Sequence, residues 1–336
     1  EIKTDTLPKR IVTEDMNFLQ QIIKGYLLEH GSSTISEIFN LVTDIQNACK
    51  ISQPFVNSNG IARWLDSFTI YDSVSRKYSL DKQIPLVNNL VWGDSLEVLK
   101  RIPDKSIDAC VTDPPYNIEG SRNKEIGWYK SNPLWKEEKG FNKISEKWDK
   151  FTASSYEDFT YKWLNEIRRV VKDNGNIAIF GSYHNIFKIG YILEQLDFRI
   201  INSIVWYKRN AFPNITQRMF CESTEYIIWA VNNNAKKAKN WTFDYQRMKE
   251  LNNGKQMRNM WDITSTPLSE KKQGKHPSQK PLQVLDRLTL AFTNENEIII
   301  DPFLGSGTTA LSALNNGRRY LGIDSNLDYL MTAITV

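Results

Sequence analysis

The sequence has few cysteines, few histidines and no long apolar run. Three cysteines in 336 residues, Cys49, Cys110 and Cys221, are too few for a disulfide framework, and their spacing matches no zinc site. Three histidines add little to a metal cluster, so we expect no metal. No apolar run approaches the roughly 18 residues that a membrane span requires, and no signal peptide opens the chain. We therefore expect no membrane association and a soluble, cytoplasmic protein.

The excess of one charge is also small. Lys and Arg number 43 against 39 Asp and Glu, so the formal net charge of +4 indicates an anionic partner only weakly. Hydrophobic residues make up 40% of the chain and charged residues 24%, which is ordinary for a globular protein and argues against extended disorder. At about 150 residues per domain, the length predicts two globular units.

The first 85 residues have a pattern of their own. Periodic apolar residues predict helices within 18–27, 35–42 and 61–68, and Glu37 stands near a capping-box position for the second of them. Strand-like segments at 69–71 and 77–80 then predict a β-hairpin. Three helices followed by a hairpin are typical of a winged helix, and the alternative is a helical accessory domain that only packs on its neighbour. We divide the chain into a domain of residues 1–85 and a domain of residues 86–336.

From about Val87 the pattern alternates between strands and helices. Strands are expected at 89–92, 107–111, 176–180, 200–207, 225–231, 297–300 and 319–323. Helices are expected at 95–102, at 156–171 with an end at Asp173-Asn174-Gly175, and at 309–315. This alternation predicts a mostly parallel sheet with helices on both faces. Sites in such sheets lie at the carboxyl ends of strands, where Asp94, Asp113, Asp301 and Asp324 stand.

The sharpest motif is Asp113-Pro114-Pro115-Tyr116, which directly follows a buried strand. The two prolines fix φ and remove two backbone donors, so the Asp113 carboxylate and the Pro114 carbonyl can both act as outward acceptors. Tyr116 adds a flat ring beside them. Two acceptors and a ring suit a flat heterocycle that carries an exocyclic amino group; the alternative is a polar turn at the strand end.

A second motif, Asp301-Pro302-Phe303-Leu304-Gly305-Ser306-Gly307-Thr308-Thr309, links a strand to a helix. Its glycines allow the backbone to approach a ligand, and the helix N-terminus favours a negative group such as a carboxylate. It is neither the dinucleotide fingerprint nor a P-loop, and the alternative is a structural turn. The next strand ends in Asp324, an acid that can bind ribose hydroxyls. The pair therefore predicts a cofactor that contains a nucleoside.

Together the two motifs resemble those of the DNA amino-methyltransferases that use S-adenosylmethionine. The order, with the catalytic motif first and the cofactor motif near the C-terminus, is that of the β class. Other segments that resemble family elements are Gly93-Asp94-Ser95, His276-Pro277-Ser278-Gln279-Lys280-Pro281 and Gly322-Ile323-Asp324. The resemblance covers residues 87–336 and leaves the first 85 residues outside.

The resemblance implies an α/β fold, a circularly permuted Rossmann-like methyltransferase sheet with strand order 3-2-1-4-5-7-6, beside the small winged-helix-like N-terminal domain. It implies a direct displacement without a covalent enzyme intermediate, on an adenine flipped out of the duplex. Aspartate at the first motif position favours adenine N6 over cytosine N4. The implied catalytic residues are Asp113, Pro114, Pro115 and Tyr116. The implied cofactor-binding residues are Asp94, Asp113, Lys280, Asp301, Phe303, Gly305, Ser306, Gly307, Thr308, Asp324 and Ser325.

DNA contact requires basic side chains, which gather between the two motifs. Residues 232–282 contain 11 Lys and Arg against four acids, and in this class the target-recognition region, here about 208–275, lies between the motifs. A solvated loop is the alternative. The candidate substrate-binding residues are Asn117, Arg122, Arg218, Lys255, Arg258 and Lys275. The aromatic-rich segment 119–150 is either a loop that orders on DNA or a folded insertion.

We expect a site-specific DNA adenine-N6 methyltransferase of a restriction–modification or similar system, acting on double-stranded DNA and nucleoid-associated if bacterial. A homodimer is an expectation from the resemblance alone. The open alternatives are a cytosine-N4 methyltransferase, an RNA adenine methyltransferase, and an inactive winged-helix DNA-binding regulator.

Overall fold

The computed structural model describes residues 19–20, 22–27, 30–49, 65, 70–72, 77–79, 86, 88–117, 151–211, 213–214, 217–232, 239–270, 279–326, 329–330 and 333. Most of the helix expected at 61–68, the segment 119–150, and the candidate residues Arg122 and Lys275 lie outside this part of the chain.

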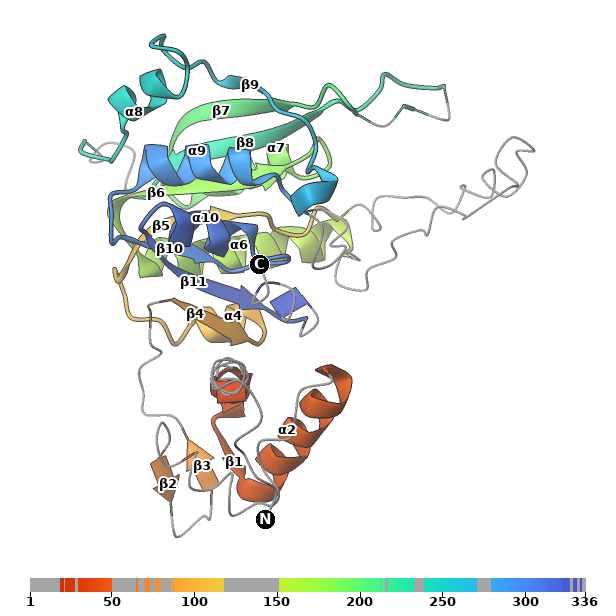
Figure 1. The fold of residues 1–336 in the computed structure, drawn as a ribbon, viewed down its shortest axis with the longest axis vertical. Coiled ribbons are helices and arrows are strands. Elements are labelled where there is room, and N and C mark those ends of the chain that lie inside the picture. The colour runs from red at the N-terminus through yellow and green to blue at the C-terminus, as the bar shows by residue number, and fades with distance from the viewer. Residues whose placement is uncertain are drawn as a thin grey trace.

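The N-terminal region contains a small sheet beside a helix (Figure 1). Its elements are β1 (Ser32–Thr34), α2 (Ile35–Cys49), β2 (Ile70–Asp72) and β3 (Lys77–Ser79). The strands pair antiparallel in the order β1-β3-β2, so the expected hairpin is present. The capping box is also confirmed, because Thr34 N donates to the Glu37 carboxylate at 2.7 Å and Glu37 N donates back to Thr34 Oγ1 at 3.3 Å. Strand β1 was not expected, since its polar Ser-Ser-Thr sequence is typical of a helix start.

The remainder of the chain is built on an eight-stranded sheet in the order β4-β11-β10-β5-β6-β8-β7-β9. Its strands are β4 (Asn89–Trp92), β5 (Ile107–Thr112), β6 (Val171–Gly181), β7 (Arg199–Tyr207), β8 (Thr224–Val231), β9 (Met260–Asp262), β10 (Ile298–Asp301) and β11 (Arg319–Asp324). Strand β8 pairs antiparallel with both of its neighbours, and the other pairs are parallel. The mixed α/β sheet expected from the alternating pattern is thus confirmed.

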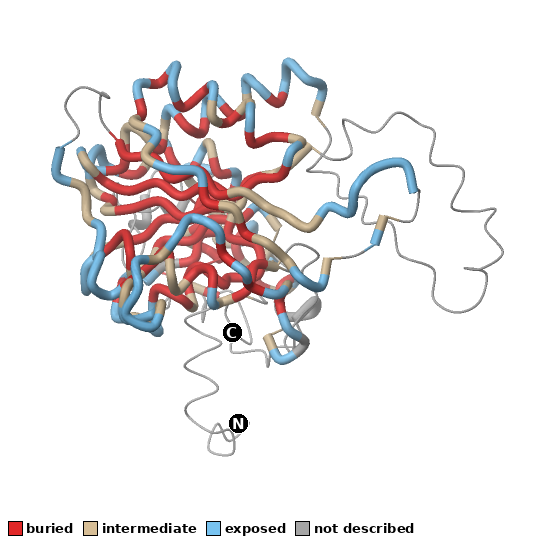
Figure 2. The backbone as a smooth tube through the Cα atoms, turned by 90° about the horizontal axis from the view of Figure 1, so that it is seen from above, coloured by how far each residue is buried: buried red, intermediate tan, exposed pale blue. Residues whose placement is uncertain are grey.

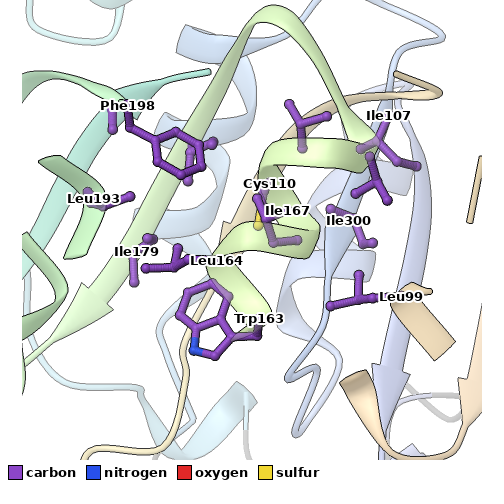
Figure 3. Packing of buried hydrophobic residues seen from close by; sticks show 14 of the residues in the cluster. Leu99, Ile107, Cys110, Trp163, Leu164, Ile167, Ile179, Leu193, Phe198 and Ile300 are labelled. Atoms are coloured by element: carbon purple, nitrogen blue, oxygen red, sulfur yellow. The ribbon is translucent and has the colours of Figure 1, made fainter. Parts of the chain in front are cut away.

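Helices cover both faces of this sheet and bury two apolar cores (Figures 1 and 2). The helices are α4 (Ser95–Leu99), α6 (Ala153–Val170), α7 (Ile186–Gln195), α8 (Tyr245–Glu250), α9 (Leu282–Phe292) and α10 (Thr308–Asn315), and a 3-10 helix spans Leu268–Glu270. Helices α4, α6 and α7 share one core, in which Trp163 and Leu164 are fully buried (Figure 3). Helices α8, α9 and α10 share the other core. Strand β6 alternates accordingly, with Ile179 in the first core and Phe180 in the second.

Strand β6 begins earlier than the sequence pattern predicted. Helix α6 ends at Val170, and residues 173–175, expected to form a turn, belong to the strand. Asn174 N donates to Asn232 O at 2.8 Å and Asn232 N donates to Gly175 O at 2.9 Å, so the backbone pairing continues. Asn174 has a φ of 63°, and the register with β5 shifts here. The Asn-Gly pair therefore marks a bulge, which tolerates the same backbone conformations as a turn.

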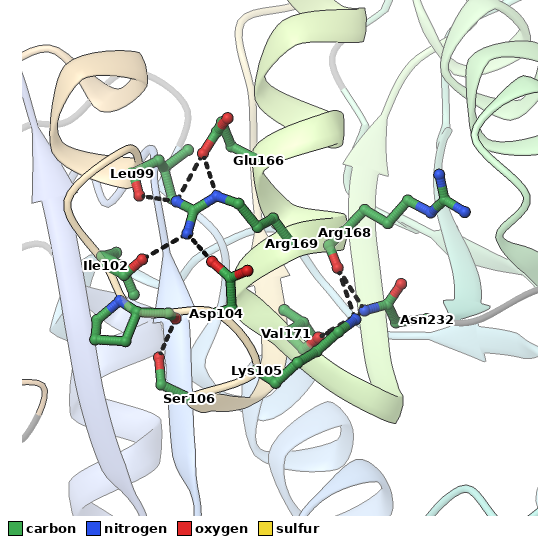
Figure 4. A network of polar contacts seen from close by, with 11 residues as sticks. Leu99, Ile102, Asp104, Lys105, Ser106, Glu166, Arg168, Arg169, Val171 and Asn232 are labelled. Carbon is green, nitrogen blue, oxygen red and sulfur yellow. Dashed lines mark hydrogen bonds and ion pairs between the residues drawn. The ribbon is translucent and has the colours of Figure 1, made fainter.

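Arg169 ties the end of α6 to the segment that follows α4 (Figure 4). Its guanidinium donates to the carbonyls of Leu99 and Ile102 at 2.6 and 2.7 Å and forms ion pairs with Glu166 and Asp104. Free carbonyls at a helix end need donors, and arginine supplies several at once. This network holds α4 and α6 together on the face of the sheet that they share with α7.

The N-terminal unit packs on the edge strand β4. A Cβ added to Gly25 would come within 2.4 Å of the Trp92 carbonyl oxygen, so the backbones are in close contact. Trp92 also packs against the apolar cluster of the N-terminal unit, and its indole donates to Ser325 O at 3.1 Å. An edge strand exposes unpaired backbone groups, and this contact covers one side of it.

Candidate functional site

A cavity of about 370 Å³ lies at the carboxyl ends of β5, β10 and β11. Strands β5 and β10 are neighbours, and Thr112 Oγ1 donates to Asp301 Oδ1 at 2.7 Å although the two residues are far apart in sequence. Of the candidate residues, those that line the cavity are Asp94, Asp113, Pro114, Pro115, Tyr116, Lys280, Asp301, Phe303, Gly305, Ser306, Thr308, Asp324 and Ser325. The fold thus brings the two motifs to one site.

Two candidates near the cavity do not line it. Gly307 has a φ of 84°, and a Cβ there would lie 2.5 Å from the Ala333 Cβ, so this glycine permits close packing of the C-terminal segment. Asn117 accepts a hydrogen bond from Phe151 N at 3.0 Å and has a φ of 56°. Both residues shape the loops around the site.

The candidate DNA contacts are spread along the sheet. Lys255 and Arg258 are exposed and lead into β9, which β6, β8 and β7 separate from β5. Arg218 is exposed on the connection between β7 and β8, which leaves the sheet at the same edge as the cavity. Lys280, counted among the basic residues of 232–282, is buried in the cavity wall, so it is not available to a phosphate.

The Asp113 carboxylate is held from one side only. Lys280 Nζ forms a short ion pair with Asp113 Oδ2, and this ammonium is only 7% exposed. Asp113 Oδ1 is buried, with no hydrogen-bond partner among the described residues. An unpaired buried carboxylate oxygen is costly and calls for a donor. The cavity therefore presents an acceptor in a fixed orientation.

Two further charged residues belong to this network, Glu225 and Lys208, and neither was among the residues expected from the sequence. Glu225 is the second residue of β8 and Lys208 follows β7, and their side chains pair at 2.9 Å. Glu225 Oε2 also lies 3.5 Å from Lys280 Nζ and accepts a hydrogen bond from the Tyr116 hydroxyl at 3.2 Å. No motif marks these residues. A signal was available only in their polarity beside apolar strand runs.

Burial and charge shift the pKa values in this network. Burial raises the pKa of Asp113, although Lys280 opposes the shift. Burial also raises the pKa of Tyr116 well above its ordinary value, and the neighbouring carboxylates add to the effect. Burial alone would lower the pKa of Lys280, but the two carboxylates outweigh it and the pKa is raised. Lys280 is therefore a cation and Tyr116 a neutral hydroxyl.

Asp301 is buried where the two motifs meet. Its carboxylate accepts hydrogen bonds from Thr112 Oγ1 and, at 3.1 Å, from Phe303 N. Burial nevertheless raises the pKa of Asp301 to about 7. At neutral pH this carboxyl is only partly ionised.

This shift predicts how stability depends on pH. Between pH 3.8 and about 7 the native state retains a proton at Asp301 that the unfolded state has lost. The free energy of unfolding should therefore fall as pH rises through this range, by about 2–4 kcal/mol. Urea titrations of the wild type and Asp301→Asn from pH 4 to 8 measure this contribution. Parallel pH curves for the two proteins would contradict it.

Asp324, Asp94 and the turn after β10 also line the cavity. Asp324 Oδ2 accepts from Gly305 N at 2.8 Å and Oδ1 accepts from Asn326 N at 2.8 Å, so the strand end and the glycine turn are locked together. Asp94 caps α4 by accepting from Leu96 N and Glu97 N. Gly305 has a φ of 55°, a conformation that glycine adopts without strain.

The lining chemistry suits a cationic ligand with a nucleoside. Four carboxylates and one ammonium line the cavity, which also contains the apolar side chains of Leu96, Phe303 and Leu304. S-adenosylmethionine combines an adenine ring, a ribose, a carboxylate and a positively charged sulfur. The apolar wall suits the adenine, the strand-end acid Asp324 the ribose, and the turn before α10 the carboxylate, while the lining carboxylates suit the positive sulfur. The residues present fit this cofactor.

The part of the chain that the structure describes was compared with the requirements of a membrane span and of a metal site. None of its helices is both long and apolar enough to cross a bilayer. The same residues include no group of three or more His, Cys, Asp and Glu side chains placed to hold a metal ion.

The sequence is similar to known DNA methylases. The DNA methylase family N6_N4_Mtase matches residues 107–335. The type II methyltransferase M2.LlaDCHI of Lactococcus lactis subsp. cremoris is 43% identical over 247 residues, which are 73% of this chain and 87% of the relative. The type II methyltransferase M2.DpnII of Streptococcus pneumoniae is 42% identical over the same shares.

Solved structures are also similar to this chain. The complex of M1.HpyAVI with SAM matches with a TM-score of 0.52 and 28% identity, over 73% of this chain and 97% of the other. The cytosine-N4-specific PvuII DNA methyltransferase matches with a TM-score of 0.56, over 75% of this chain and 86% of the other. At 16% identity, the second match shows a common fold alone.

Proposed function

This chain belongs to the DNA methylase family and is a DNA methyltransferase that uses S-adenosylmethionine, and we propose that it methylates N6 of an adenine in double-stranded DNA within a restriction–modification system. The type II methyltransferase relatives support this setting. Aspartate at the start of the Asp-Pro-Pro-Tyr motif supports adenine as the target.

The observation that carries this proposal is the Asp113 carboxylate in the cavity wall, one of whose oxygens has no hydrogen-bond partner among the described residues. An exocyclic amino group has two protons to donate, one for the Asp113 carboxylate and one for the Pro114 carbonyl. The two bonds localise the nitrogen lone pair, which is otherwise delocalised into the ring, and aim it at the methyl donor. The rate gain comes from position and electrostatics.

Other residues divide between the cofactor and the base. When bound, S-adenosylmethionine supplies a methyl group on a positively charged sulfur. We assign Asp324 to the ribose, the turn from Gly305 to Thr308 to the carboxylate, and Phe303 to the adenine ring. Tyr116 lines the cavity beside Asp113 and would stack on the flipped target base. Asp113 or water takes the proton that the methylated nitrogen loses, whereas Tyr116 is already protonated.

Glu225 acts in this proposal as a positioning residue. It holds the Tyr116 hydroxyl and shares Lys280 with Asp113, so it fixes both groups that would contact the base. Glu225→Gln should lower kcat by about 10- to 100-fold with little change in the affinity for S-adenosylmethionine. Because the Glu225 charge raises the pKa of Asp113, the acid limb of the kcat–pH profile should also move to lower pH.

Rescue by a conservative variant separates this role from a purely structural one. Glu225→Asp keeps the charge and should recover part of the rate and the original acid limb. A Glu225→Gln enzyme with lower kcat but an unmoved pH profile would show that Glu225 only supports the fold.

The sheet order supports a circularly permuted methyltransferase domain at residues 86–336. The chain enters at edge strand β4, and β10 and β11, the last two strands in sequence, lie between β4 and β5.

We also propose that residues 1–85 form a winged-helix domain, supported by α2 and the antiparallel strands β1, β3 and β2. If that domain contacts phosphates, removing residues 1–85 will lower the salt dependence of DNA affinity. The proposed homodimer is tested by sedimentation equilibrium.

Incubation of the purified protein with labelled S-adenosylmethionine and DNA or RNA, followed by nucleoside analysis, tests the function. The expected product is N6-methyladenine in DNA. N4-methylcytosine or labelled RNA would each establish one of the alternatives, and a protein that binds DNA without transfer would be an inactive regulator.

A further inference from the structure

The connection between β7 and β8 leaves the sheet on the same side as the cavity and presents an aromatic side chain to solvent. Its outer part, residues 217–222, is exposed throughout and is called the tip loop here. Phe220 is 97% exposed and Met219 is 52% exposed. In Figure 2 the exposed connection projects beyond the buried sheet. Two such exposed apolar side chains side by side on a loop indicate a partner with apolar surface.

The base of this connection is rigidly joined to the site. Lys208 N donates to Ser223 O at 2.7 Å and closes the neck of the loop. On the inner side, Lys208 and Glu225 form the ion pair that leads to Tyr116. On the outer side, Arg209 pairs with Asp262 at 2.7 Å. The two ends of the connection that carries the tip loop therefore lie beside the ring assigned to the flipped base.

The charge of the tip loop indicates which kind of partner surface it can contact. It carries one cation, Arg218, and one anion, Glu222, so phosphate attraction cannot be its main contribution. The exposed groups that remain are a flat ring and a flexible apolar side chain. Stacked bases are the apolar surface of DNA, and aromatic or apolar side chains enter base steps in proteins that distort the duplex.

We propose that Phe220 inserts into the base stack of the substrate DNA beside the target adenine and stabilises the duplex from which that base has been flipped. This inference rests on the proposed function. In this proposal Phe220 touches neither the cofactor nor the reacting atoms. It lowers the free energy that is needed to flip the target base out of the duplex.

The test compares two DNA substrates that differ in the free energy needed to flip the target base out of the duplex. One duplex contains the methylation site in paired form, and the second has an abasic site opposite the target adenine, which removes the pairing partner. Phe220→Ala should lower kcat/KM on the paired duplex about tenfold, the size expected for losing one base–aromatic stack. On the abasic duplex the loss should be less than about twofold. Phe220→Trp should retain activity on both.

Phe187→Ala is the matched control, since Phe187 is 75% exposed on α7 and should leave both rates unchanged. A Phe220→Ala enzyme that loses equal activity on both duplexes, or none on either, overturns the proposal. Unchanged methylation with an altered oligomeric state would instead assign the tip loop to a contact between copies. If the wild type modifies cytosine, the proposed target fails while the Phe220 comparison can still be made.

Discussion

Asp113→Asn should abolish most methyl transfer while leaving the cofactor site intact. The amide keeps the size of the carboxylate but loses its charge, and its NH₂ group cannot accept a hydrogen bond from the target amino group. Removal of one such preorganised contact costs about 10²- to 10³-fold in kcat. Single-turnover methylation with saturating DNA and S-adenosylmethionine measures the chemical step directly.

The control for Asp113→Asn is ligand binding. Calorimetry should give a nearly unchanged affinity for S-adenosylmethionine, because Asp324 and the turn at Gly305 are untouched. A variant that retains more than about a tenth of the wild-type rate would contradict the assignment of Asp113 as the acceptor of the amino protons.

Lys280→Met should have the largest effect on stability. Lys280 is buried between Asp113 and Glu225, and its loss leaves two partly buried carboxylates without their shared counter-charge. Removing one partner from a buried ion pair costs about 3–5 kcal/mol. Lys208→Met is the matched control, because Glu225 keeps Lys280; its cost should be about 1–2 kcal/mol. Urea denaturation at pH 7 measures both.

A double variant identifies the cause of this loss. Lys280→Met combined with Asp113→Asn removes the uncompensated charge at Asp113, so part of the lost stability should return. If the double variant is less stable than Lys280→Met by the full cost of Asp113→Asn alone, the two residues are not coupled and the charge argument fails.

Much of the sheet and the cavity could be predicted because the signal is local. Apolar runs that end in an acid located β5, β10 and β11, and their parallel arrangement placed Asp113 and Asp301 at one edge of the sheet. The prolines and glycines after those strands set the backbone near the ligand. These features depend on neighbours in sequence.

The charged network could not be predicted because it depends on contacts across strands. Glu225 lies opposite Trp206 in the antiparallel pair of β7 and β8, and Lys208 reaches it from the other strand. Lys280 comes from the segment before α9. No spacing in the sequence relates these three residues. The resemblance includes Lys280 among the cofactor residues, and the structure places it in the cavity wall, paired with Asp113.

The structure of polar segments was also difficult to predict from the sequence. The Asp173-Asn174-Gly175 sequence fits a turn and a bulge equally, and only pairing with Asn232 decides between them. Lys255 and Arg258 were grouped with the DNA contacts because they lie in the basic segment between the two motifs. The structure places them before β9, at the far side of the sheet from β4, and their contact with DNA stays a prediction. Charge composition does not fix a position in space.

The most direct test of the account is the modification pattern of DNA from cells that produce this protein. Sequencing that detects modified bases, with mass spectrometry of the nucleosides, should find N6-methyladenine at one short sequence. Cells that produce Asp113→Asn at the same level should lack it. N4-methylcytosine at that sequence, or N6-methyladenine that persists with Asp113→Asn, would contradict the account.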